Sequence, residues 1–148
     1  MTFVSSNHAI MYENLTPVFA DVDEHLCLNP ESVESLITKK TKAIMFIGIG
    51  GNVGQLKKIV EICKKHKLKL ILDAAHMAGT YIKDGDSHRH VGHDADVTIF
   101  SFQSVKNLPT ADSGMICFKN DDYDILCRKM SWLGISKDTY QRTNDSGS

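Results

Sequence analysis

The sequence has no excess of charge of either sign and no long apolar run. Its 148 residues include 17 Lys and Arg against 18 Asp and Glu, for a formal net charge of −1. A surface for nucleic acid or an anionic membrane is therefore not expected. No apolar segment approaches the ~18–20 residues that cross a bilayer, and the N-terminus lacks the basic and apolar regions of a secretory signal. These absences favour a globular protein of the cytoplasm.

Cysteine is also scarce, with four residues in the whole chain. Cys27, Cys63, Cys117 and Cys127 include no pair at CxxC spacing, which argues against a zinc site built from them. We expect free, mostly buried thiols, as is usual in a reducing compartment.

What the chain does contain is an alternation of apolar runs and amphipathic stretches. Strands are predicted over 16–21, 42–49, 68–73, 96–102 and 114–118. Helices are predicted from Pro30 with Asn29 as cap, over 53–66, and over 121–130 with Asp121 or Asp122 as cap. This order indicates an α/β fold, a three-layer sandwich with a mainly parallel sheet. The polar stretch 83–94 is expected to be a loop.

Polar side chains follow two of the predicted strands, where a parallel sheet collects ligand-binding groups. Asp73 ends one strand, and Ser101 ends another, five residues before Lys106. Pyridoxal 5′-phosphate (PLP) needs an amine to hold it, a carboxylate beside its pyridine nitrogen and donors for its phosphate. These segments could supply all three.

Two motifs, DAAH over 73–76 and SFQSVKN over 101–107, occur in this order together with TKAI over 41–44. In this combination the chain resembles the DegT/StrS family of PLP-dependent sugar aminotransferases, which have the aspartate aminotransferase fold type I. The resemblance covers the central part of the large domain. It implies a partial PLP-binding large domain over 1–142 and a flexible polar tail over 143–148.

The resemblance implies a role for each matched residue. Lys106 matches the Schiff-base lysine that also carries protons, and Asp73 matches the acid paired with the pyridine nitrogen. His76 matches the residue near the phenolic oxygen of the cofactor, Ser101 the phosphate-binding hydroxyl, and Phe3 the ring stacked on the cofactor face.

Each assignment has a simpler alternative. Lys106 could be a surface lysine, Asp73 a loop or capping acid, and His76 a histidine satisfied within a polar loop. Ser101 could bond only the backbone, and Phe3 could pack in the core.

The resemblance further implies transfer of an amino group from an amino acid, with glutamate as the expected donor, to a nucleotide-linked keto-deoxysugar. Related dehydratases lack the lysine, so Lys106 favours transamination. A homodimer is implied as well. The turn that cups the phosphate and the small C-terminal domain of the family lie outside these 148 residues. The alternative is therefore a truncated, inactive core that acts only as a folding or interaction module.

Two further patterns suggest other ligands. The glycines of 48–54 follow a strand, as in a nicotinamide site, but GxGxxG fails because Val53 or Asn52 stands where glycine is needed. A tight strand-to-helix turn is the favoured reading. His88, His90 and His93 could suggest a metal, but nothing fixes them on one rigid face, so no metal is predicted.

Overall fold

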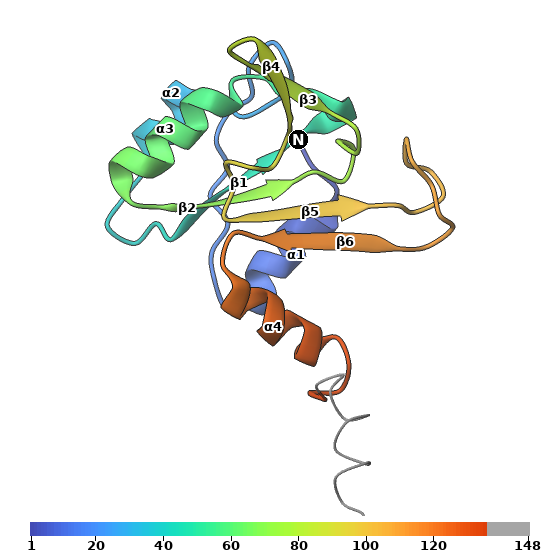
Figure 1. Ribbon diagram of the computed structural model, residues 1–148. Helices are drawn as coiled ribbons and strands as arrows, with labels where there is room; N and C mark the ends of the chain where they lie inside the picture. The colour runs from blue at the N-terminus through green and yellow to red at the C-terminus, as the bar shows by residue number, and fades with distance from the viewer. Residues whose placement is uncertain (136–148) are drawn as a thin grey trace, which may run out of the picture. The chain divides into compact units, whose positions relative to one another are not determined.

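The computed structural model describes residues 1–135, which fall into a compact unit over 1–117 and a second unit beginning at Phe118 (Figure 1). The main unit is built on a four-stranded sheet of order β1-β2-β5-β6. Its strands are β1 (Ala43–Ile47), β2 (Lys69–Asp73), β5 (Val97–Ser101) and β6 (Gly114–Phe118). β1, β2 and β5 pair in parallel, whereas β6 runs in the opposite direction (Figure 1). The predicted α/β fold with a mainly parallel sheet is confirmed.

The core lies on one face of this sheet. α3 (Leu56–His66) packs on β1 and β2, and α2 (Pro30–Leu36) packs on α3. Burial alternates along the strands, so that every second residue points to the helices. The buried strand residues on this face are Ile44, Phe46, Leu70, Leu72, Thr98 and Phe100. The residues between them are half-buried or exposed and belong to the opposite face.

The cap predicted for α2 is confirmed. The side-chain oxygen of Asn29 accepts hydrogen bonds from the backbone N–H groups of Glu31, at 2.9 Å, and Ser32, at 3.1 Å. Pro30 occupies the first helical position, where no backbone N–H is needed. The local sequence therefore sets where this helix begins.

Asn29→Ala should destabilise the protein by about 1 kcal/mol, because two N–H groups at the helix start would lose their acceptor. In a protein of this size we expect the melting temperature to fall by about 2–4 °C. Ser35→Ala, at an exposed position of the same helix, is the control and should melt like the wild type. Equal melting of both variants would contradict a stabilising cap.

Two expectations about the main unit are wrong, and one of its helices was not predicted. The run 16–21 forms no strand; Val18 and Phe19 in it are exposed, and only an isolated bridge joins Val22 to Leu28 nearby. The carbonyl of Asp21 accepts from the backbone N–H of Asn29 at 3.0 Å, but across residues 1–135 no neighbouring strand continues this pairing along the run.

The stretch 83–94 is the second correction. It is largely a hairpin of β3 (Tyr81–Asp84) and β4 (Ser87–His90), not a loop. The two residues of its turn, Gly85-Asp86, are a known hairpin signal, which the polarity of the strands obscured. Arg89 ties the hairpin together through ion pairs with Asp84, at 3.0 Å, and Asp94, at 2.7 Å.

The helix that the pattern did not predict is α1 (Val4–Tyr12). Its sequence, VSSNHAIMY, has no apolar stripe, and Ser6 is its only buried residue.

Within the described part of the chain, 1–135, no helix is long and apolar enough to cross a membrane.

The second unit contains α4 (Asp121–Met130), as predicted, but with a different cap. Asn120, not Asp121 or Asp122, accepts the hydrogen bond from the N–H of Asp122, at 2.8 Å. The two aspartates lie in the first turn, where they face the positive end of the helix dipole. The tail predicted over 143–148 lies outside the described residues.

The four thiols are free, as expected, but only two are buried. Cys27 and Cys63 lie in the core, Cys117 is exposed and Cys127 is half-buried. Burial raises the pKa of the Cys63 thiol to about 11, and the carboxylate of Asp96 adds to the effect.

This pKa predicts a loss of stability in base. An unfolded cysteine ionises near pH 9, whereas folded Cys63 holds its proton to about pH 11, so the free energy of unfolding should fall between these values. From pH 8 to pH 10 we expect Cys63 to account for a loss of about 1 kcal/mol. Urea unfolding at both pH values, compared with Cys63→Val, measures it. Equal losses in the two proteins would contradict the prediction.

Candidate functional site

The carboxyl edge of the parallel strands brings two of the predicted site residues onto one face. Asp73 is the last residue of β2 and pairs in register with Ile99 of β5. Ser101 is two residues further along β5, so it points to the same face as Ile99 and Asp73. This face is the one opposite α3, and both side chains are half-buried there.

The Asp73 carboxylate accepts a hydrogen bond at each oxygen. The hydroxyl of Ser6 donates to Oδ2 at 2.8 Å, and the backbone N–H of Ala75 donates to Oδ1 at 3.2 Å. The second contact is the loop role considered as the alternative for Asp73. The first comes from α1, 67 residues away in the sequence, and no sequence motif indicated it.

His76 lies in the loop after β2, and its contact defines its tautomer. The backbone N–H of Gly50 donates to Nδ1 of His76 at 3.2 Å. Because Nδ1 accepts, a neutral His76 carries its hydrogen on Nε2. Nε2–H is then the group that His76 could offer as a donor to a phenolic oxygen.

The glycine loop that His76 contacts forms a turn, as predicted. It runs from β1 through a short 3-10 helix, η1 (Ile49–Gly51), to α3. A Cβ on Gly48 would lie 2.0 Å from the sulfur of Met77, and one on Gly54 would lie 2.6 Å from Cβ of Cys27. Both positions therefore require glycine for close packing.

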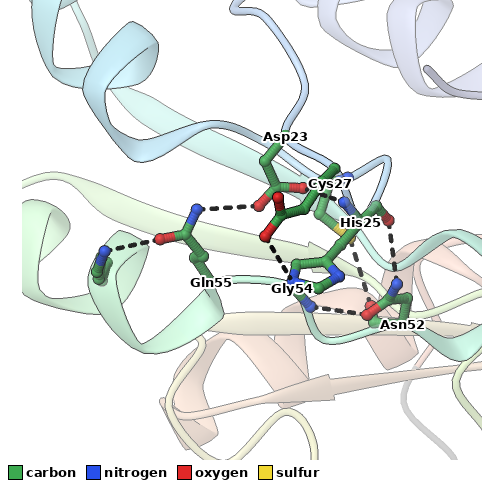
Figure 2. A network of polar contacts seen from close by, with 8 residues as sticks. Asp23, His25, Cys27, Asn52, Gly54 and Gln55 are labelled. Carbon is green, nitrogen blue, oxygen red and sulfur yellow. Dashed lines mark hydrogen bonds and ion pairs between the residues drawn. The ribbon is translucent and has the colours of Figure 1, made fainter.

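A polar network joins the segment 23–27 to the end of this loop and supports it there (Figure 2). Oδ2 of Asp23 accepts from the side chain of Gln55 at 3.1 Å, and Oδ1 accepts from the backbone N–H groups of His25 and Cys27. Burial acts to raise the pKa of Asp23, but the hydrogen bonds from Gln55, His25 and Cys27 hold it below its ordinary value. The amide of Asn52 completes the network by donating to the carbonyl of His25, at 3.1 Å. This Asp23 network fixes the entry to α3.

Lys106 lies in a turn just after β5. Its backbone N–H donates to the carbonyl of Gln103 at 2.9 Å, and its side chain is half-buried. Within residues 1–135 the amine of Lys106 has no hydrogen-bond or ion-pair partner. The next residue, Asn107, donates from its side chain to the carbonyl of Ala78 at 2.7 Å. Asn107 thereby ties the Lys106 turn to the loop that carries His76.

Ser101 and Phe3 occupy positions that leave them accessible. The oxygen of Ser101 accepts from the N–H of Gln103 at 3.4 Å, which leaves the hydroxyl hydrogen available to a phosphate oxygen. Phe3 is 77% exposed, so the core-packing alternative is wrong. It precedes α1, and its carbonyl accepts from the N–H of Ser6, which contacts Asp73.

The sequence profile of the DegT/DnrJ/EryC1/StrS aminotransferase family matches residues 1–147. The chain belongs to this family. The resemblance inferred from the two motifs is confirmed, and PLP is the cofactor of the family.

Individual relatives agree with this membership. The chain is 34% identical to the spore coat polysaccharide biosynthesis protein SpsC of Bacillus subtilis over its full length and 37% of that protein. The solved structure of DesI with its TDP-sugar product matches at TM-score 0.80 and 30% identity, over 93% of this chain and 34% of DesI. The solved structure of NtdA of Bacillus subtilis, with bound PMP, matches at TM-score 0.79 and 25% identity, over 92% of this chain and 31% of NtdA. The chain thus spans about a third of the length of these relatives.

Proposed function

We propose that this chain is the central part of the cofactor-binding domain of a PLP-dependent sugar aminotransferase, with that domain extending over 1–142. The observation that carries the proposal is the placement of Asp73 at the carboxyl end of β2 and of Lys106 after the adjacent parallel strand β5, with Asn107 joining the two loops. Family membership supports the same reading.

The donor set at this edge suits PLP. Lys106 would hold the cofactor covalently and carry a proton to and from the substrate carbon. Asp73 would keep the pyridine nitrogen protonated. Ser101 would donate to the phosphate, Nε2–H of His76 to the phenolic oxygen, and Phe3 would cover one ring face. When bound, PLP supplies an electron sink for the substrate carbon.

For the substrate we propose a nucleotide-linked keto-deoxysugar, with glutamate as the amino donor. The TDP-sugar product in the structure of DesI supports a nucleotide sugar, and the polysaccharide biosynthesis role in the name of SpsC supports the same class. We also propose a homodimer, and a cytoplasmic location, which the free core thiols Cys27 and Cys63 support.

The second candidate is a core without catalysis that acts as a folding or interaction module. These residues correspond to about a third of the length of each relative. The two candidates differ in whether this chain holds PLP at Lys106.

The test is to mix the purified chain with PLP, record the visible spectrum, reduce with borohydride and map the adduct by mass spectrometry. An adduct on Lys106 supports the proposed function. Adding glutamate to the complex before reduction should then bleach the visible band as the amino group is transferred.

Two outcomes would go against the proposed activity, and a third would go against the proposed homodimer. The absence of a band and of an adduct would exclude cofactor binding by this chain. A band that glutamate leaves unchanged would favour the inactive module. Sedimentation that shows a strict monomer would argue against the homodimer.

A further inference from the structure

We propose that Ser6 is a positioning residue for Asp73. Its hydroxyl would hold the Asp73 carboxylate in the orientation that pairs with the pyridine nitrogen of PLP. This inference rests on the proposed function, and it gives a role to α1, for which the site motifs provided none.

The geometry around Asp73 supports this role. A carboxylate turns easily about its last side-chain torsion, which has broad preferences. Here each oxygen has its own donor, Ser6 on Oδ2 at 2.8 Å and the N–H of Ala75 on Oδ1 at 3.2 Å. The two donors come from separate segments, so together they fix the plane of the carboxylate. Ala75 alone would leave it free to rotate.

The environment of Ser6 indicates that its hydroxyl is held for this contact. Ser6 is 8% exposed and is the only buried residue of α1, so the first turn of the helix meets the rest of the fold through a polar group. The hydroxyl oxygens of Thr2 and Ser6 are 2.8 Å apart. Because the single Ser6 hydrogen is directed at Asp73, the Thr2 hydrogen is shared between the oxygen of Ser6 and the carbonyl of Phe3, which lies 3.2 Å from the Thr2 hydroxyl. The result is a relay from Thr2 through Ser6 to Asp73.

The relay has a consequence that anchoring of α1 alone would not have. Asp73 oriented by Ser6 would keep the pyridine nitrogen protonated. A protonated ring withdraws electrons from the Lys106 nitrogen bound to the cofactor, and it is the loss of a proton from this nitrogen that changes the visible band. Without the hydroxyl, the ring proton would be held less firmly and the midpoint of that titration should rise. Two other titratable side chains, His76 and Lys106, lie at this edge, and neither is altered by a change at Ser6.

The experiment compares Ser6→Ala with Ser5→Ala, a change at an exposed neighbour on α1, in the full chain with PLP. For Ser6→Ala we expect the adduct to remain on Lys106, the affinity for PLP to fall about tenfold and the midpoint of the visible band to rise by about half a pH unit or more. Ser5→Ala should match the wild type in all three.

A second pair of variants distinguishes the effect of the hydroxyl donor from the effect of side-chain shape. Thr and Val have nearly the same volume, but only Thr keeps the donor, so Ser6→Thr should retain the wild-type midpoint and Ser6→Val should not. This comparison also serves if the alanine variant fails to fold.

Three results would overturn the inference. If Ser6→Ala melts at a lower temperature but keeps the wild-type affinity and midpoint, Ser6 only anchors α1. The same holds if the Thr and Val variants share one midpoint while the wild type binds PLP. If the wild type itself gives no adduct on Lys106, the proposed function fails, and the role of Ser6 fails with it.

Discussion

Replacing Lys106 by alanine is expected to abolish both the visible band with PLP and the adduct found after reduction. The amine of Lys106 lies in the turn after β5, half-buried and without a partner in the part of the chain that the structure describes. No other lysine follows the carboxyl end of β2 or β5 in these loops. Transfer of the amino group from glutamate should fall by about 10⁴-fold, because the proton carrier is lost as well.

The measurement is a PLP titration by absorbance, followed by mass spectrometry of the reduced protein. Lys39→Ala removes an exposed lysine from the turn before β1 and should leave band and adduct unchanged. An adduct that persists in Lys106→Ala at the wild-type level would refute the assignment.

Asp73→Asn should separate cofactor binding from chemistry. An amide has nearly the shape of the carboxylate, and its oxygen can still accept one of the two hydrogen bonds, from Ser6 or from Ala75. The adduct on Lys106 should therefore still form. An uncharged amide stabilises a pyridinium far less than a carboxylate does, so the glutamate half-reaction should slow by about 10²–10³-fold.

Stopped-flow absorbance of the visible band after addition of glutamate measures this rate. Asp86→Asn, at the tip of the β3–β4 hairpin, is the matched control and should react at the wild-type rate. A rate in Asp73→Asn within about threefold of the wild type would argue that Asp73 is a loop acid without a role at the pyridine nitrogen.

The strands of the sheet were predictable because their signal is local. Apolar runs of five to eight residues bounded by polar ones predicted β1, β2, β5 and β6, and Asn29 with Pro30 predicted the start of α2. The parallel arrangement then implied that Asp73, Ser101 and Lys106 would follow strands at one edge. Each step needs only the period of the apolar residues and the chemistry of a helix end.

Elements with weak apolar signals were missed for the complementary reason. α1 has no apolar stripe, and the β3–β4 hairpin is polar. Their formation therefore depends on side-chain contacts that the apolar pattern does not show. In the hairpin these are the ion pairs of Arg89 with Asp84 and Asp94. The run 16–21 is the opposite case, since it is apolar but pairs with no strand among residues 1–135.

The sequence by itself determined where the sheet strands lie along the chain, the capped start of α2 and which residues lie at the strand ends. Only the tertiary structure decided how those residues are oriented. Ser6 donates to Asp73 across 67 positions, Gly50 sets the tautomer of His76, and Asn107 joins two loops. Local propensity spans a few residues, whereas a hydrogen bond between distant segments depends on where packing places both, and the sequence pattern carries no record of that placement.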